Sequence, residues 1–309
     1  MKLRRFPFLL LIIPVLISCS RKAVSTATAA PDDSRPVVYT VNYPLYYFAD
    51  RIAGEHIDLR FIAPPDVDPA YWKPSNDEAA RMQQGDILFL NGATYAKWMT
   101  RITMPMSILY DTSKGFSDDL LEVEDAVIHS HGNGKAHSHA GTAFTTWLDF
   151  SLAKKQAEVV RDVLVRKIPG AKKEIESNAK ALLSDLDRLD EAASKVAAEI
   201  GGRPLVASHP VYQYLAHAYE LKIRSVHWEP DTVPDAKAVR ELSKILSDHE
   251  AGWMIWEGEP NADSIALLEE RGIHSLVFDP CGNRPSEGDW LSVMRANLEN
   301  LKSAAESKE

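Results

Sequence analysis

One stretch near the middle of the chain has the clearest helical periodicity in the sequence. Apolar residues recur there at alternating spacings of four and three, at Ile175, Ala179, Leu182, Leu186, Leu189, Ala193, Val196 and Ile200. Because an α-helix has 3.6 residues per turn, this spacing places these side chains along one side of a single helix. A helix over residues 171–200 would be about 45 Å long. It could pair with a second copy as a coiled coil, but its central position favours packing across both halves of its own chain.

The segments on either side of this helix alternate short β-rich runs with helical runs. Before it, we expect strands at 37–41, 59–62 and 87–90, with helices at 45–53 and 75–84. After it, we expect strands at 205–207, 223–226, 253–256 and 275–278, with helices at 211–219, 235–247, 262–271 and 291–301. Such alternation predicts parallel sheets covered by helices. The sequence therefore predicts an α/β fold of two lobes joined by one long rigid helix, with a ligand cleft between the lobes.

The N-terminal end has the layout of a bacterial lipoprotein signal peptide. Basic residues precede an apolar run at 6–17, which leads into Leu16-Ile17-Ser18-Cys19. This run is shorter than the roughly 20 residues that span a bilayer, so a lipid on Cys19 is the expected anchor; plain secretion is the alternative. The expected segments are a signal peptide at 1–19, a tether at 20–36, an N-terminal lobe at 37–150, helices at 151–200 and a C-terminal lobe at 201–309.

Composition narrows the class of function. A formal net charge of -9 argues against nucleic acid as a partner, because phosphates select basic surfaces. Hydrophobic residues make up 45% of the chain, which is enough to build real cores. Of the 2 cysteines, Cys19 is assigned to lipid, which leaves Cys281 without a partner for an intramolecular disulfide.

Four short segments carry a resemblance to a known family. They are Pro64-Pro65-Asp66-Val67-Asp68-Pro69 with Tyr71-Trp72-Lys73-Pro74, then Trp147-Leu148-Asp149, Ser208-His209-Pro210 and Phe278-Asp279-Pro280. In this order they resemble the site segments of the periplasmic zinc and manganese substrate-binding lipoproteins of ABC transporters (cluster A-I, zinc-uptake type). The likeness covers roughly residues 37–301. It implies two four-stranded α/β lobes, one long connecting helix and a metal held between the lobes.

The resemblance also implies metal ligands, of which only two are present. His209 and Asp279 each follow a predicted strand and match ligand positions of the family. The other two positions carry histidine in the family, but here they are Ala70 and Thr145. Alanine has no donor atom and a threonine hydroxyl is a poor zinc ligand, so the site diverges from the family at these positions.

Three interpretations of this incomplete ligand set are possible. Glu257, Glu259 or His227, which follow predicted strands, could complete it. The histidines of a loop at 129–139 could donate imidazoles instead; they are His129, His131, His137 and His139. Finally, the cleft could bind a different ligand, with an aromatic lining of Trp72, Trp147, Trp228 and Trp256.

Three further segments bear on the site. The His-rich loop favours zinc over manganese, because imidazole suits zinc better than the harder ion, although a solvated loop that binds metals weakly is the plainer interpretation. Residues 227–231 resemble a family loop with a Glu-Pro element near the cleft mouth, or else form an ordinary turn. Cys281 would be a good soft ligand as a thiolate, but beside a proline turn a buried, inert thiol is expected.

These features predict an extracytoplasmic, lipid-anchored and monomeric receptor of an ABC importer. It would capture Zn²⁺, or less readily Mn²⁺, and deliver it to the permease. The alternative is the same fold without the family's site, binding another ligand or acting as a surface scaffold or adhesin. An enzyme is not expected, although His209 and Asp279 could hold a hydrolytic zinc with Glu257 or Glu259 as general base. The sequence shows no HExxH motif, nucleophile elbow or phosphate loop to support that chemistry.

Overall fold

The structure is a computed structural model that describes residues 35–65, 67–123, 128–129, 137–138 and 141–306. Residues 35–309 make up one compact unit by their contacts. The proposed signal peptide, with Cys19, and most of the tether lie outside the described residues. Among the helices that are described, none is both long and apolar enough to cross a membrane.

The N-terminal half contains a four-stranded parallel sheet in the order β2-β1-β3-β4. Its strands are β1 (Val37–Thr40), β2 (Asp58–Arg60), β3 (Ile87–Leu90) and β4 (Leu109–Asp111). The helices α1 (Tyr43–Ala53) and α2 (Asn76–Gln83) accompany it. Ser75 starts α2 with a capping box, since its side chain accepts from the Glu78 amide and its own amide donates to the Glu78 carboxylate. We call this sheet with α1 and α2 the N-terminal lobe.

The C-terminal half repeats this plan with a parallel sheet in the order β10-β9-β11-β12. Its strands are β9 (Leu205–Ala207), β10 (Ile223–Ser225), β11 (Trp253–Trp256) and β12 (His274–Val277). The helices of this half are α5 (Gln213–Ala218), α6 (Ala236–Leu246) and α7 (Ala262–Glu269). We call this sheet with α5, α6 and α7 the C-terminal lobe. The two sheets share one connectivity, so the predicted repetition of the α/β plan is confirmed.

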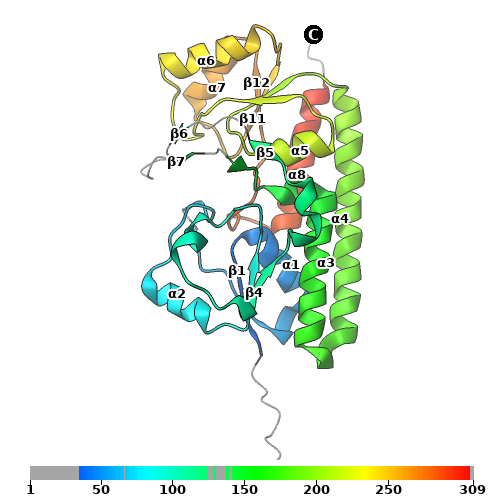
Figure 1. Ribbon diagram of the computed structural model, residues 1–309. Helices are drawn as coiled ribbons and strands as arrows, with labels where there is room; N and C mark the ends of the chain where they lie inside the picture. The colour runs from blue at the N-terminus through cyan, green and yellow to red at the C-terminus, as the bar shows by residue number, and fades with distance from the viewer. Residues whose placement is uncertain (1–34, 66, 124–127, 130–136, 139–140, 307–309) are drawn as a thin grey trace, which may run out of the picture. The chain divides into compact units, whose positions relative to one another are not determined.

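The predicted long helix is present as α4 (Lys172–Ile200), and it runs beside α3 (Phe150–Lys167) along both lobes (Figure 1). Every residue of the predicted apolar stripe is buried. The helix contacts α1 of the N-terminal lobe and α8 (Trp290–Lys302), which follows the C-terminal sheet. The stripe therefore packs within the chain and is not available for a coiled coil.

A charged cluster reinforces this packing near the middle of α4. Asp185 is 9% exposed, and its carboxylate accepts a hydrogen bond of 2.8 Å from Arg51 on α1. Arg188 on α4 binds the other oxygen, which Arg295 on α8 also approaches at 3.4 Å. Asp185 thus links α4 to α1 and to α8. We call these four residues the Asp185 cluster.

Shorter elements connect these parts. The two-residue strands are β5 (Glu122–Val123), β6 (Ile128–His129), β7 (His137–Ser138) and β8 (Gly141–Thr142), paired as β5-β8 and β6-β7. The 3-10 helices are η1 (Gly54–His56), η2 (Lys97–Arg101), η3 (Met106–Ile108), η4 (Lys114–Asp119), η5 (Thr146–Leu148), η6 (Pro169–Ala171) and η7 (Ser303–Ala305). The predicted element bounds differ from the observed ones by a few residues, and β4 has no counterpart among the predicted elements.

Candidate metal site

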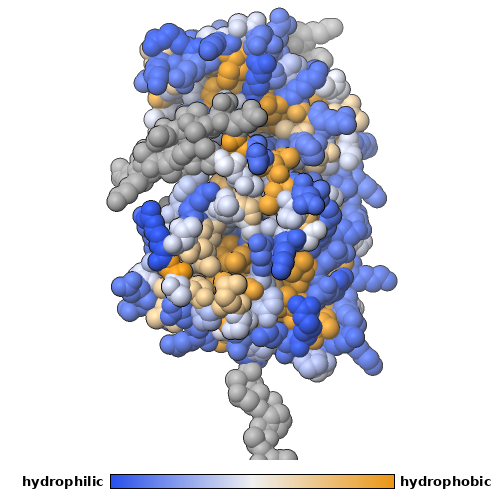
Figure 2. Space-filling model, in the orientation of Figure 1, coloured by the Kyte–Doolittle hydropathy of each residue, from blue (hydrophilic) through white to orange (hydrophobic). Residues whose placement is uncertain are grey.

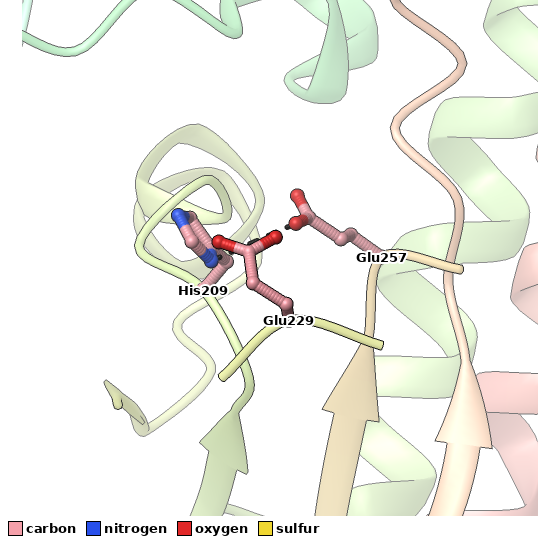
Figure 3. A group of neighbouring side chains, drawn as sticks. All are labelled: His209, Glu229 and Glu257. Carbon is pink, nitrogen blue, oxygen red and sulfur yellow. Dashed lines mark ion pairs between the residues drawn. The ribbon is translucent and has the colours of Figure 1, made fainter. Parts of the chain in front are cut away.

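Three potential metal ligands meet at one edge of the C-terminal sheet. His209 follows β9, Glu229 lies in the loop after β10, and Glu257 directly follows β11. Because these strands are neighbours in a parallel sheet, their carboxyl ends lie at the same edge, and Figure 3 shows the three side chains converging above it. The backbone fixes the arrangement, since the Ser208 amide donates to the Ile255 carbonyl and the Trp228 amide to the Ser208 carbonyl, each at 2.8 Å.

The spacing of these groups suits a metal ion. One ligand atom from each of His209, Glu229 and Glu257 lies within 4.8 Å of the others, and Nδ1 of His209 is 3.6 Å from Oε1 of Glu257. Around a tetrahedral zinc with bonds of 2.0–2.1 Å, neighbouring ligand atoms are about 3.3 Å apart. Only modest side-chain movements are then needed to bind an ion. We call these three residues the C-lobe triad.

Burial also favours metal binding by the triad. The His209 side chain is 0% exposed, whereas that of Glu257 is 20% exposed. Carboxylates held beside an imidazole in a partly desolvated place are stabilised by a cation, and two carboxylates balance the charge of one divalent ion. The triad can therefore hold Zn²⁺ as a site of zero net charge, with a neutral imidazole as its third ligand.

The other predicted ligands lie at varying distances from this group. Asp279 is outside the triad, and its Oδ1 accepts a 2.7 Å hydrogen bond from the Cys281 amide. Burial raises the pKa of Asp279 above its usual range, although this hydrogen bond opposes the rise. The ring of His227 is 5.6 Å from that of His209 between centroids, so His227 lies beside the triad. Glu259 is exposed and also lies outside the group.

Two positions where the family places histidine have other roles here. Ala70 is fully buried and has no donor side chain. The Thr145 hydroxyl donates a hydrogen bond of 2.6 Å to the carbonyl of Val211, which lies just before α5 in the C-terminal lobe. A side chain at this position thus links the two halves of the chain through a hydrogen bond instead of offering an imidazole.

Cys281 does not offer a ready thiolate. It is 2% exposed, and burial, followed by the nearby charges of Asp279 and Asp289, raises the pKa of its thiol. The thiol therefore stays protonated at neutral pH, whereas metal binding requires the thiolate.

The histidine loop is described only in part. Strands β6 and β7 pair antiparallel, with His129 directly opposite His137. His131 and His139 lie outside the described residues, so the role of this loop as a metal site stays a prediction.

A cleft of about 310 Å³ opens between segments of both halves. Its lining comprises Val67, Asp68, Pro69, Tyr95, Phe144, Thr145, Trp147, Val211, Glu257, Asp279, Pro280, Gly282 and Asn283. Glu257 thus belongs both to the triad and to the cleft. Apolar surface emerges between the two lobes in Figure 2, while the outer edges are mainly hydrophilic. The predicted ligand cleft is present.

The aromatic lining predicted for this cleft is correct at one position. Trp147 lines the cleft, and its indole donates to the Pro280 carbonyl at 2.7 Å. Trp228 and Trp256 instead pack together in the C-terminal lobe, with ring centroids 6.1 Å apart. Trp72 packs against Trp98 and is not part of the lining either. Tyr95 and Phe144 supply the other aromatic walls.

Comparison with known proteins agrees with this architecture. Residues 38–304 match the model of the family described as zinc-uptake complex component A, periplasmic. The chain belongs to this zinc-uptake family. It is 25% identical over 302 residues to the zinc-binding lipoprotein AdcA of Streptococcus pneumoniae, with 94% of this chain and 60% of AdcA covered. It thus spans about 60% of that relative's length.

Two further relatives match over nearly their full length. The high-affinity zinc uptake system protein ZnuA of Bacillus subtilis is 25% identical over 301 residues, which cover 93% of each chain. The crystal structure of the Zn(II)-bound ZnuA-like domain of Streptococcus pneumoniae AdcA superposes with a TM-score of 0.74 at 21% identity, covering 89% of this chain and 100% of that domain. The family resemblance and the two-lobe fold predicted from the sequence are therefore confirmed.

Sequence reasoning did not name Glu229 as a candidate ligand. The residue lies in the 227–231 segment, whose Glu-Pro element was expected near the cleft mouth. The signal was present, because an acidic side chain in the loop after a strand adjacent to β9 is carried to the same sheet edge as His209.

Proposed function

We propose that this zinc-uptake family member is a receptor that binds one Zn²⁺ ion at the C-lobe triad and delivers it to an ABC permease. The observation that carries the proposal is the convergence of His209, Glu229 and Glu257, with ligand atoms within 4.8 Å of one another. An imidazole with two carboxylates is a donor set that zinc accepts. Mn²⁺ is the second candidate, because carboxylates also suit that harder ion.

A site built in this way suits a transport protein. Three protein ligands leave a coordination position for water or another donor, and an open position lets ligands exchange. The ligands come from turns after three strands of one lobe, so zinc can enter or leave through local shifts of these turns. The helix α4, packed along both lobes, limits larger rearrangements. Family membership and this arrangement support a receptor role with no catalytic step.

The cellular setting belongs to the same proposal. The Cys19 lipobox, together with the name of the lipoprotein relative, supports a lipid-anchored protein outside the cytoplasmic membrane. Burial of the α4 stripe within the chain supports a monomer. The partner would be the permease of an ABC importer.

The test is a competitive zinc titration, with metal analysis, of the purified protein. The titration uses a background in which the four loop histidines are replaced by asparagine, so that weak binding to the loop does not contribute. We call this background the loop-Asn form; it replaces His129, His131, His137 and His139. Within it, His209→Ala removes the triad imidazole, and His217→Ala, at an exposed position of α5, is the matched control.

We expect one tightly bound zinc per chain in the loop-Asn form. His209→Ala should weaken it by at least about 100-fold, since even partners that only orient a metal ligand contribute 10–100-fold. His217→Ala should leave the affinity unchanged. Zinc binding that is weak and that disappears in the loop-Asn form would refute the receptor proposal.

A further inference from the structure

The cleft beside the triad is much larger than a metal ion requires. A cavity of only about 10–15 Å³ can hold one water molecule. At the roughly 30 Å³ that each water occupies in the liquid, the 310 Å³ of the cleft corresponds to room for on the order of 10 water molecules. That volume lies at the lower end of the range for clefts that bind small organic molecules, which is about 300–1,000 Å³.

The charges of the lining residues indicate which kind of ligand fits the cleft. Asp68, Glu257 and Asp279 contribute carboxyl groups, and none of the lining residues in the described part of the chain is basic. Tyr95, Phe144 and Trp147 supply aromatic faces beside them. A ligand that is neutral or positively charged overall, with an apolar part, complements this surface. A multiply charged anion does not.

One polar atom of the lining points to an organic ligand and not to an ion alone. Tyr95 is 2% exposed, and its hydroxyl has no hydrogen-bond partner within the described residues. Burial raises the pKa of Tyr95 well above its usual range, so the hydroxyl stays protonated and can donate. A buried donor without an acceptor is costly, and an acceptor group of a bound molecule would relieve that cost. A metal cation cannot accept this hydrogen bond.

The loop that carries Tyr95 has an unusual backbone. Gly92, Ala93 and Thr94 all have positive φ, at 74°, 47° and 57°. Alanine and threonine rarely adopt this conformation, and such strain tends to be kept where a side chain must be held in place for function. Here the three strained residues directly precede Tyr95, which is buried at the cleft.

We propose that the cleft binds zinc together with a small amino-acid chelator. This inference rests on the proposed function. Nitrogen donors of the chelator would share the zinc with the C-lobe triad, and its carboxylate would accept the hydrogen bond from Tyr95. Thr145, which lines the cleft, is smaller than the histidine that the family resemblance places at this position, and this fits an added occupant. No covalent step is involved.

Equilibrium dialysis of the loop-Asn form with radiolabelled L-histidine, with and without zinc, tests the proposal. L-Histidine is the probe because its amine and imidazole bind zinc while its complex with one zinc carries a single positive charge. We expect one histidine retained per chain when zinc is present, and none without it. Zinc citrate, an anionic complex, should not be retained as a unit.

Two variants locate the chelator. Tyr95→Phe removes the hydroxyl and keeps the ring, so histidine retention should weaken about three- to tenfold while binding of zinc alone is unchanged. Gly282→Leu should abolish histidine retention, because a Cβ at Gly282 would lie 3.4 Å from the Tyr95 hydroxyl and 3.6 Å from Cζ2 of Trp147. Gly252→Leu is the matched control, since a Cβ there meets nothing within 4 Å. Neither glycine has a positive φ.

The outcomes separate this inference from the proposed function. If zinc alone binds tightly and histidine is not retained, or strips the zinc away, the chelator proposal is wrong and the receptor proposal stands. Retention of citrate in place of histidine would overturn the charge argument. Equal retention by the wild type and Gly282→Leu would exclude the cleft as the place of binding. If zinc binds neither alone nor with histidine, both proposals fail.

Discussion

Replacement of Thr145 by valine separates two roles for this position. In the structure the Thr145 hydroxyl donates a 2.6 Å hydrogen bond to the Val211 carbonyl. Thr145 is only 4% exposed. Valine has nearly the same shape but lacks the hydroxyl, so the carbonyl loses this donor. An unsatisfied buried polar group costs about 1–3 kcal/mol. We therefore expect Thr145→Val to lower the free energy of unfolding by about 2 kcal/mol.

This loss of stability can be measured by thermal unfolding. For the unit of residues 35–309, an unfolding entropy of about 2.1 cal/mol/K per residue makes 1 kcal/mol correspond to a Tm shift of about 1.7 °C, so the variant should melt about 3–4 °C lower than the wild type. Zinc affinity, measured by competitive titration on the same samples, should change by less than about threefold, because Thr145 is not part of the triad. Thr100→Val, at an exposed position of η2 where the hydroxyl donates to the Lys97 carbonyl, serves as the comparison for the same chemical change.

Two other outcomes would contradict a purely structural role for Thr145. A tenfold or greater loss of zinc affinity with an unchanged Tm would mean that the Thr145 oxygen binds the metal. An unchanged Tm with unchanged affinity would mean that the hydrogen bond between the two halves contributes nothing measurable.

Three other predictions concern the triad and the helix α4. Glu257→Gln should weaken zinc binding by at least about 100-fold in a titration, whereas Glu259→Gln, two residues away and exposed, should not. Leu186→Ala, at a fully buried position of the α4 stripe, should lower the free energy of urea unfolding by about 2–5 kcal/mol; a loss under 1 kcal/mol would contradict the packing. Asp185→Asn should lower it by about 1–3 kcal/mol at pH 7. Burial alone would raise the pKa of Asp185, but hydrogen bonds from Arg51 and Arg188 outweigh burial and lower it. This stabilisation is therefore complete above the unfolded pKa of about 3.9 and disappears as the pH falls through the lower folded value, so a difference that grows as the pH falls below about 3.9 would count against the cluster.

Much of the fold could be predicted because its signals are local. The stripe from Ile175 to Ile200 is a long periodic pattern, and the structure buries all of it along α4. Strand β4 was missed because its residues, Leu109-Tyr110-Asp111, have no alternation and too little length to stand out. Its strand conformation depends on pairing with β3, a contact between distant parts of the chain.

The candidate site was harder to predict for a related reason. The positions of His209 and Glu257 follow from strand ends that the sequence reveals. Glu229 is several residues beyond the end of β10, so its place depends on how that loop folds back over the sheet edge. The Thr145 hydrogen bond and the buried Tyr95 hydroxyl depend on packing between the two halves, which no local pattern encodes.

Zinc binding at the C-lobe triad can be tested directly by anomalous diffraction at the zinc edge from crystals of the loop-Asn form grown with zinc. We expect one strong peak about 2.0–2.2 Å from an imidazole nitrogen of His209 and from carboxylate oxygens of Glu229 and Glu257. A peak bound by Asp279 and away from Glu229, or no ordered zinc in the C-terminal lobe, would contradict zinc binding at the triad.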